Sequence, residues 1–259
     1  MDKLIAIKIG SNVLTRTDGR LDITRLSAIV DQISDLRREG YRIIVISSGA
    51  VASGRSELKG SFELDEVSQR QLYSSVGQAR LMHNYYQFFK EQGFNCGQVL
   101  TTKDHFTDET SYLNQKNCMQ VMLDAGIIPI VNENDTVAIH ELMFTDNDEL
   151  ASLIAVMMGV SALIILSNVD GVFTGDPSDS ASKLLREIDP ADDSVLGFIG
   201  EKKSTNGRGG MKTKFSVARK IASEGIEVII ANGKRDDILT DIMHGCQATP
   251  YTRFKTPEK

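Results

Sequence analysis

Five short apolar runs most constrain what this 259-residue chain can fold into. A strand with one face in water alternates apolar and polar residues, whereas these runs are apolar almost throughout, which predicts strands buried on both faces. The runs occupy residues 4–9, 42–46, 127–131, 162–166 and 227–231. Strands of this kind belong to a mainly parallel sheet that is covered by helices on each side.

Helical patterns separate the apolar runs. Apolar residues spaced by three and four predict a helix that ends before Gly40, and similar patterns occupy residues 67–89, 150–158, 215–221 and 236–243. This alternation predicts an α/β fold, a three-layer α/β/α sandwich with a mainly parallel central sheet. No internal repeat or low-complexity linker divides the chain, so we expect a single domain over residues 1–259, with the polar residues 174–203 as an insertion or flap.

The charge balance and the cysteine content exclude several classes of protein. The 29 Lys and Arg against 35 Asp and Glu give a net charge of −6, which argues against a nucleic-acid partner. Three cysteines far apart fit neither a disulfide framework nor a zinc site, so a cytoplasmic location is expected. Lys8 interrupts the N-terminal apolar run too early for a signal peptide. Residues 150–169 carry no charge, but Gly159 within them predicts a helix followed by a strand rather than a membrane span.

Ligands of parallel sheets collect at the carboxyl ends of the strands, so the residues after each apolar run are informative. Lys8, Gly10 and Ser11 end the first run and offer a positive charge and backbone N–H groups to a phosphate; a lysine that protects an edge strand is the alternative. Ser48 and Gly49 follow the second run, where they predict an oxyanion or carboxylate nest, or alternatively an ordinary serine N-cap.

Two acidic segments follow the third run. Residues 132–136, Asn-Glu-Asn-Asp-Thr, suit an ammonium group or a hydrated metal, with a surface turn as the alternative. Asp146 and Glu149 have the spacing of a helix capping box, which leaves Asn147 and Asp148 without a structural reason. We therefore expect Asp148 to hold a lysine near a phosphate and Asn147 to bind a substrate carboxylate.

A glycine turn at residues 206–214, Asn-Gly-Arg-Gly-Gly-Met-Lys-Thr-Lys, runs directly into a predicted helix. Bare backbone, a helix N-terminus and lysines one turn later predict a phosphate cradle, with a flexible loop before a basic helix as the alternative. The sequence lacks the P-loop motif and the protein-kinase signatures. The joint occurrence of these features at successive strand ends indicates phosphoryl transfer from a nucleotide.

The motifs KxGSN, SSGAVASG, VGQ, NENDxVA, FxDNDELA and GRGGMxTK occur in this order along nearly the whole chain. In this set the chain resembles the amino acid kinase family, and within it the branch that phosphorylates glutamate. The resemblance implies ATP-dependent phosphorylation of the L-glutamate γ-carboxylate to L-glutamyl 5-phosphate, the first step of proline biosynthesis. A family member that acts on another small acid, and a non-catalytic nucleotide-binding regulatory module, are the alternatives.

The resemblance also implies roles for individual residues. Lys8 and Lys214 would neutralise the transferring phosphoryl group, and Asp148 would hold both lysines. Glutamate would be bound by Ser48, Asp135 and Asn147. The nucleotide would be bound by Lys8, Gly10, Ser11, Ser167, Asn168, Arg208, Gly209, Gly210, Met211, Lys212, Thr213 and Lys214. Mg²⁺ would accompany ATP, with no direct metal ligand indicated. Asn168 stands where family members usually have aspartate, so the side chain near the nucleotide is a neutral amide here and not a charged carboxylate.

The chemistry supports this assignment without the resemblance. A glutamate γ-carboxylate has a pKa of about 4.3 and is already an anion at neutral pH, so no general base is required. What opposes the reaction is repulsion between that anion and the ATP phosphates. Positioning and charge neutralisation should therefore supply the catalysis, which agrees with the absence of a conspicuous catalytic residue among the four histidines.

Several partners follow from the resemblance alone. It implies inhibition by L-proline at a site overlapping the glutamate pocket, a homo-oligomer, and hand-over of the labile product to glutamate-5-semialdehyde dehydrogenase. Many relatives continue into a C-terminal PUA domain, and in a departure from them we expect this sequence to hold the kinase domain alone. The polar residues 101–120 are predicted to form a loop with a regulatory role.

Overall fold

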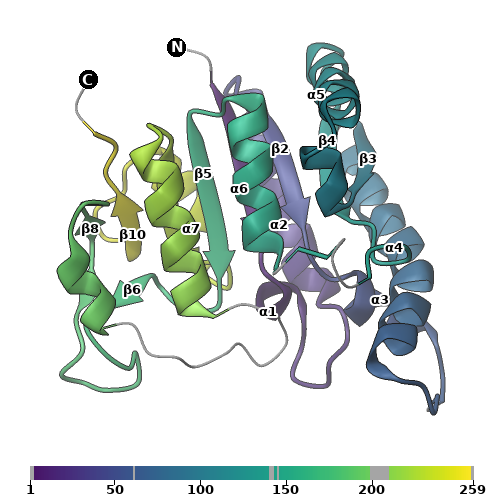
Figure 1. The fold of residues 1–259 in the computed structure, drawn as a ribbon, viewed down its shortest axis with the longest axis horizontal. Helices are drawn as coiled ribbons and strands as arrows, with labels where there is room; N and C mark the ends of the chain where they lie inside the picture. The colour runs from purple at the N-terminus through teal and green to yellow at the C-terminus, as the bar shows by residue number, and fades with distance from the viewer. Residues whose placement is uncertain (1–2, 61, 140–142, 145, 199–209, 258–259) are drawn as a thin grey trace.

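The computed structural model describes residues 3–60, 62–139, 143–144, 146–198 and 210–257. These residues form a central sheet between two layers of helices (Figure 1). The sheet has eight strands in the order β3-β4-β2-β1-β5-β9-β10-β8. All neighbouring strands are parallel except β9 and β10, which are antiparallel. The predicted α/β fold with a mainly parallel central sheet is confirmed.

The strands of this sheet are β1 (Leu4–Ile9), β2 (Arg42–Ser47), β3 (Cys96–Thr101), β4 (Ile128–Glu133), β5 (Ala162–Ser167), β8 (Glu187–Ile188), β9 (Glu227–Asn232) and β10 (Tyr251–Phe254). The five predicted strands are β1, β2, β4, β5 and β9, which lie side by side in the middle of the sheet. Central strands are covered on both faces, and this is why their sequences are apolar almost throughout.

The helices form two layers that bury opposite faces of the sheet. One layer, α5 (Glu109–Asp124), α6 (Asn147–Met158) and α7 (Met211–Ser223), packs on the side of Leu4 and Ala6. The other contains α1 (Ser11–Leu14), α2 (Ile23–Arg38), α4 (Glu66–Glu91) and α8 (Ile238–Met243), and it packs on the side of Ile5 and Ile7. Alternate residues of β1 therefore belong to two separate apolar cores.

The predicted loop at residues 101–120 is wrong. These residues form the end of β3, a short 3-10 helix at Lys103–Phe106 and most of α5. In α5 only Met119 and Leu123 are buried, so its sequence carries a weak apolar stripe. Of the polar residues 174–203, the described part forms β7 (Leu184–Leu185), paired with β6 (Val172–Phe173), then β8 and a 3-10 helix at Asp193–Phe198.

The helix α3 (Ala50–Glu57) packs unusually close to α4. A Cβ atom at Gly77 would lie 1.8 Å from the carbonyl oxygen of Ala50, and one at Gly54 would lie 1.9 Å from that of Tyr73. Two facing glycines thus allow the backbones to touch, since any side chain would separate them. This contact fixes α4 against α3, the helix that follows β2.

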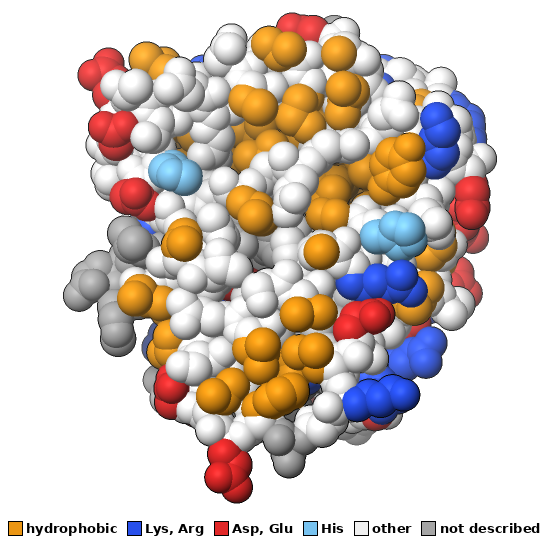
Figure 2. All heavy atoms as spheres, turned by 90° about the vertical axis from the view of Figure 1, so that its right-hand side faces the viewer, with side chains coloured by type: hydrophobic (Ala, Val, Ile, Leu, Met, Phe, Trp, Pro, Cys, Tyr) orange, Lys and Arg blue, Asp and Glu red, His pale blue; other side chains and the backbone are white. Residues whose placement is uncertain are grey.

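The uncharged stretch at residues 150–169 forms the greater part of α6, a turn at Gly159, and β5, as its sequence predicts. Among the described residues, no helix combines the length and the apolar character that a bilayer span requires. The edge of the sheet at β3, together with α4 and α5, forms one side of the molecule, and Figure 2 shows hydrophobic side chains gathered there.

Candidate active site

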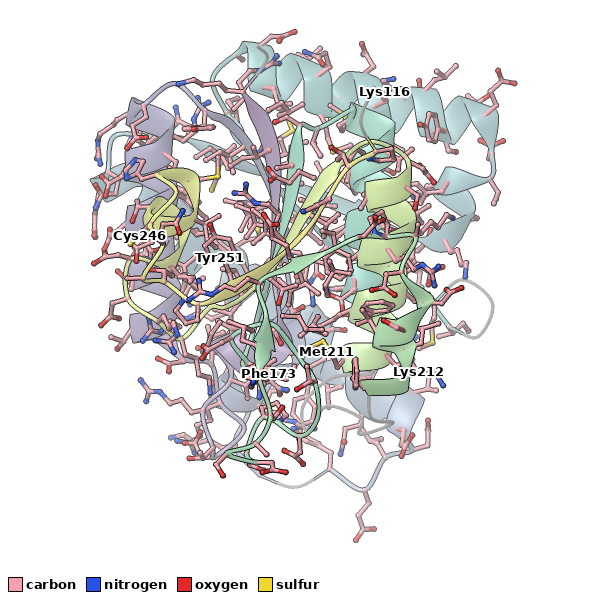
Figure 3. All side chains as sticks on the ribbon, turned by 90° about the vertical axis from the view of Figure 1, so that its left-hand side faces the viewer. Lys116, Phe173, Met211, Lys212, Cys246 and Tyr251 are labelled. Atoms are coloured by element: carbon pink, nitrogen blue, oxygen red, sulfur yellow. The ribbon has the colours of Figure 1, made fainter. Side chains whose placement is uncertain are left out.

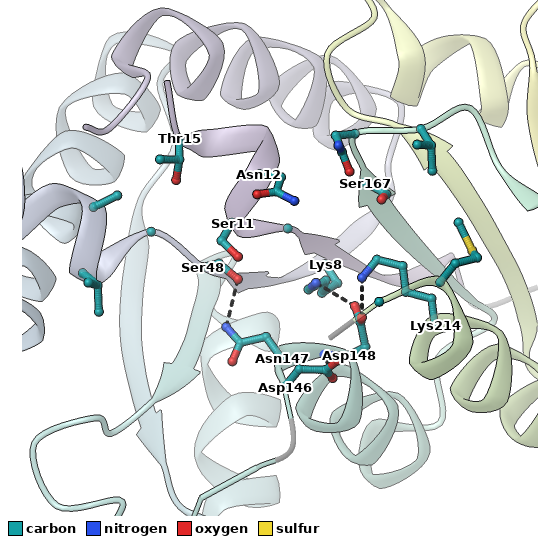
Figure 4. Close-up of a pocket in the computed structure, with 18 of the residues that line it drawn as sticks. Lys8, Ser11, Asn12, Thr15, Ser48, Asp146, Asn147, Asp148, Ser167 and Lys214 are labelled. Atoms are coloured by element: carbon teal, nitrogen blue, oxygen red, sulfur yellow. Dashed lines mark hydrogen bonds and ion pairs between the residues drawn. The ribbon is translucent and has the colours of Figure 1, made fainter. Parts of the chain in front are cut away.

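A cleft of about 980 Å³ lies at the carboxyl ends of the central strands (Figure 4). Its volume is at the upper end of the range for small-molecule sites, about 300–1,000 Å³. The wall is built from the ends of β1, β2, β4 and β5 and from the N-termini of α6 and α7. Parallel strands bring these segments together although they are far apart in the sequence.

Two lysines share one carboxylate at the base of this cleft. Lys8 Nζ lies 2.6 Å from Asp148 Oδ1, and Lys214 Nζ lies 2.7 Å from Asp148 Oδ2. All three side chains are buried, with exposed fractions of 4% for Lys8, 0% for Asp148 and 8% for Lys214. These three side chains together carry one negative and two positive charges, a net charge of +1, and Asp146 beside them interacts electrostatically with both lysines.

The electrostatics of this group follow from burial and from the shared charge. Burial lowers the pKa of Lys8, although the carboxylate of Asp148 opposes the shift. Burial alone would raise the pKa of Asp148, but Lys8 and Lys214 outweigh it and hold the pKa below its ordinary value. Asp148 is thus ionised at neutral pH, and both of its oxygens are occupied by ammonium groups.

Asp146 caps the helix that carries Asp148. Its Oδ1 accepts the backbone N–H groups of Asp148 at 2.9 Å and Glu149 at 3.1 Å, so the predicted capping function is confirmed. The carboxylate of Glu149, three residues after the cap, pairs with Lys103 at 2.9 Å. Burial, followed by the negative charge of Asp148, raises the pKa of Asp146. The cap fixes the first turn of α6 and with it the position of Asp148.

A hydrogen-bond network joins the ends of β2, β4 and α6. Asn147 Nδ2 lies 3.1 Å from the carbonyl oxygen of Ser47, from Ser48 Oγ and from Asn132 Oδ1. Asn132 Nδ2 in turn donates to Gln78 Oε1 on α4 at 2.9 Å. Polar side chains from two strand ends and from the start of α6 are therefore fixed at one point of the wall.

The end of β4 carries two acidic residues that share an arginine. Arg70, on α4, contacts Glu133 Oε2 at 2.7 Å through Nη2, and the same nitrogen contacts Asp135 Oδ1. The side chains of Glu133 and Asp135 are 2% and 12% exposed, so this is not a solvated surface turn. Arg70 was not among the predicted site residues, because a single arginine on a helix usually lies on its solvated face.

The structure decides two alternatives that the sequence left open. β1 lies between β2 and β5, so Lys8 does not protect an edge strand. The N-cap of α3 is Gly49, without a side-chain cap, so Ser48 is not an ordinary capping serine. Gly49 has a φ of +107°, a conformation that favours glycine, and this turn exposes Ser48 to the cleft.

The residues predicted to contact the nucleotide fall into three groups. The first lines the cleft and contains Lys8, Gly10, Ser11, Ser167, Asn168, Gly210, Met211 and Lys214. The second, Lys212 and Thr213, does not line it, and Lys212 is exposed on α7 (Figure 3). Arg208 and Gly209 lie outside the described residues. Within the first group, the amide of Gly10 donates to Leu166 O at 3.0 Å, so it is not available to a phosphate.

The described residues do not form a protein-only metal site. No group of three His, Cys, Asp or Glu side chains within the described ranges is arranged to hold a cation. Asp148, the most central carboxylate, has both oxygens engaged by lysines. A divalent ion that used this cleft would need most of its ligands from the phosphates of a nucleotide and from water, which is the usual environment of Mg²⁺.

This chain belongs to the amino acid kinase family, whose pattern it matches over residues 3–232. A glutamate 5-kinase of Bacteroides thetaiotaomicron is 60% identical over 250 residues, which cover 96% of this chain and 69% of that protein. A glutamate 5-kinase of Chlorobaculum tepidum is 46% identical over 244 residues, covering 94% of this chain and 67% of that protein. The chain thus spans about two thirds of the length of these relatives.

Solved structures share the fold. Carbamate kinase from Giardia lamblia bound to AMP-PNP superimposes with a TM-score of 0.70 and 15% identity, covering 98% of this chain and 99% of that one. The parallel sheet with helices on both faces is therefore the fold of amino acid kinases, as the resemblance in the sequence implies.

Proposed function

We propose that this chain transfers the γ-phosphoryl group of ATP to the γ-carboxylate of L-glutamate, forming L-glutamyl 5-phosphate and ADP. The relatives named glutamate 5-kinase support the reaction. The resemblance in the sequence implies that this product belongs to the first step of proline biosynthesis. The observation that carries the proposal is the buried pair of lysines on one aspartate, Lys8–Asp148–Lys214, which faces the cleft with a net positive charge.

Lys8 and Lys214 act on the phosphoryl group. The transferring group and the attacking carboxylate are both anionic, so the barrier contains a large repulsive contribution. Two ammonium groups in a buried setting stabilise the charge that develops between donor and acceptor oxygens. Asp148 holds them in place and touches no substrate, because its two oxygens are occupied. Proton transfer is not needed, since the carboxylate attacks as an anion.

Ser48, Asn147 and Asp135 bind the amino acid. Asn147 Nδ2 donates to Ser48 Oγ at the cleft wall, which leaves the hydroxyl hydrogen of Ser48 to donate to a carboxylate. Asp135 supplies a negative charge at the same wall, which suits the α-ammonium group. Gly10, Ser11, Ser167, Asn168, Gly210 and Met211 are proposed to surround the nucleotide, together with Mg²⁺, which supplies charge neutralisation when it is bound to the phosphates.

A substrate panel tests this function. ATP is supplied with glutamate, aspartate, N-acetylglutamate or carbamate in the presence of hydroxylamine, which traps an acyl phosphate as a hydroxamate. We expect glutamate-dependent ADP release with one hydroxamate formed per ADP. Turnover with another acid and not with glutamate would favour a family kinase of different specificity, and no turnover with any acid would favour a binding module.

We also propose that the chain forms a homo-oligomer through the side that contains β3 and α5. β3 ends the sheet, and α5 exposes Leu113 and Val121, whose exposed fractions are 55% and 57%. Exposed apolar side chains beside a free strand edge favour self-association. Light scattering should give a mass of more than one chain, and Leu113→Glu with Val121→Glu should reduce it.

Two further partners belong to this proposal. L-Proline shares the ammonium and carboxylate groups of glutamate but lacks the γ-carboxylate, so we expect it to compete with glutamate and not with ATP. An acyl phosphate is labile in water, so its hand-over to glutamate-5-semialdehyde dehydrogenase would protect it. Inhibition kinetics at varied glutamate test the first expectation, and product yield with and without the dehydrogenase tests the second.

A further inference from the structure

Arg70 is the only arginine among the described residues that joins two carboxylates at the cleft wall. It lies near the start of α4, and its side chain is 20% exposed. The same nitrogen, Nη2, contacts both Glu133 and Asp135, and Nη1 lies 3.4 Å from Met143 Sδ. These contacts do not extend to the two lysines that are proposed to act on the phosphoryl group.

Glu133 is the fixed member of this group. It is the last residue of β4, it is 3% exposed, and its Oε1 accepts the backbone N–H of Phe144 at 2.9 Å. Asp135 lies two residues beyond the strand, in a turn that contacts α4 through Arg70 and through a bond from Gln71 Nε2 to Thr136 O at 2.9 Å. Arg70 bridges the two carboxylates, so it holds the carboxylate of Asp135 at a defined position relative to the end of β4.

The charges of this group match one substrate group. Two carboxylates and one guanidinium leave a net charge of −1 at the wall, which is complementary to one ammonium group. A guanidinium has several donors in a planar fork, so it can orient one carboxylate and leave the second oxygen of that carboxylate facing the cleft.

We propose that Arg70 is a positioning residue that orients Asp135 toward the α-ammonium group of the substrate. It thereby sets the preference of the enzyme for an α-amino acid over the same diacid without an amino group. This inference rests on the proposed glutamate kinase activity. It assigns Arg70 to substrate selection and not to the phosphoryl transfer step.

Steady-state kinetics with glutamate and with glutarate, which lacks only the amino group, test the inference. For Arg70→Gln we expect the KM for glutamate to rise about 10- to 100-fold, while kcat and the KM for ATP change by less than about threefold. The preference for glutamate over glutarate, as a ratio of kcat/KM values, should fall about tenfold. Arg70→Lys should restore part of both values, because it keeps the charge but not the fork.

Arg80→Gln is the matched control. Arg80 lies on the same helix and pairs with Glu57, but both side chains are 44% exposed and neither lines the cleft. Its substitution should leave the glutamate KM and the glutarate ratio unchanged. A double substitution with Asp135→Asn adds a second readout, since removal of Arg70 should have less than about a twofold further effect once Asp135 has lost its charge.

The outcomes separate this inference from the function on which it rests. A wild-type chain that fails to phosphorylate glutamate would overturn both. A wild-type chain that is active, with an Arg70→Gln variant of unchanged glutamate KM and unchanged glutarate ratio, would overturn only the role of Arg70. A fall in kcat at unchanged KM would also overturn it. If Arg70→Gln does not fold, the Arg70→Lys variant tests the role of Arg70 through its KM for glutamate and its ratio of kcat/KM for glutamate and glutarate.

Discussion

Replacement of Asp148 by asparagine should destabilise the protein and nearly abolish its turnover. The carboxylate is fully buried and contacts Lys8 at 2.6 Å and Lys214 at 2.7 Å. The variant leaves two buried ammonium groups without an anion, and removal of one partner from a buried ion pair costs about 3–5 kcal/mol. For a chain of this length each kcal/mol lowers Tm by about 2 °C, so Tm should fall by about 6–10 °C.

Thermal unfolding by circular dichroism measures the first effect, and hydroxamate formation measures the second. We expect kcat to fall at least about 100-fold, because the lysines lose the orientation that aligns them with the phosphoryl group. A non-hydrolysable ATP analogue should raise the Tm of Asp148→Asn more than that of the wild type, since its phosphates supply the missing negative charge. A Tm within about 2 °C of wild type, with kcat within about threefold, would refute the proposed function of the shared carboxylate.

Three further perturbations follow from the same structure. Lys8→Ala and Lys214→Ala should each lower kcat about 100- to 1,000-fold in the hydroxamate assay, and near-normal turnover in either would contradict its assigned function. Because burial lowers the pKa of Lys8, its charge is lost at a lower pH than that of a free lysine. The value of kcat/KM for ATP should therefore fall at a pH below about 10.4, and this fall should shift to higher pH in Lys8→Arg. Between the lowered pKa of Lys8 in the folded chain and the value of about 10.4 in the unfolded chain, the contribution of Lys8 to the free energy of unfolding rises with pH. Gly77→Ala should lower Tm, since its Cβ would meet Ala50 O at 1.8 Å and overpacking costs about 1–3 kcal/mol, while Gly175→Ala, with its nearest neighbour at 3.6 Å, should not.

The centre of the sheet could be predicted because its strands are buried on both faces. β1, β2, β4, β5 and β9 all appear in the sequence as continuous apolar runs, with boundaries within two residues of those in the structure. β3 was missed because it is an edge strand with only Val99 and Thr101 buried, so it has no apolar run. α5 was missed for a similar reason, although Asp108, which caps its N-terminus, was a signal that could have indicated it.

The site was predictable where it depends on strand ends. Lys8, Ser48, Asn132 and Ser167 each follow or end an apolar run, and parallel strands bring such residues to one edge of the sheet. The partners across the cleft depend on how separate layers pack, which a linear pattern does not contain. Arg70 illustrates this, since only the approach of α4 to the end of β4 shows that it faces two carboxylates and not solvent.

In the glycine turn, the sequence also could not show which side chains face the cleft. Sequence adjacency grouped Lys212, Thr213 and Lys214 with the phosphate cradle, but a helix directs successive side chains to different sides. In the structure Lys214 is buried against Asp148, whereas Lys212 is exposed on α7. The periodicity of the helix therefore distinguishes two lysines that the motif alone treats alike.

The fate of the carboxylate oxygen tests most directly whether glutamate itself attacks the phosphorus of ATP. Glutamate labelled with ¹⁸O in its γ-carboxylate is incubated with the enzyme, ATP and hydroxylamine, and the released phosphate is examined by ³¹P NMR. If the carboxylate attacks, the bridging oxygen of the acyl phosphate comes from glutamate, and the phosphate expelled by hydroxylamine carries one ¹⁸O atom. Phosphate without ¹⁸O would show that water is the acceptor and would contradict a glutamate kinase.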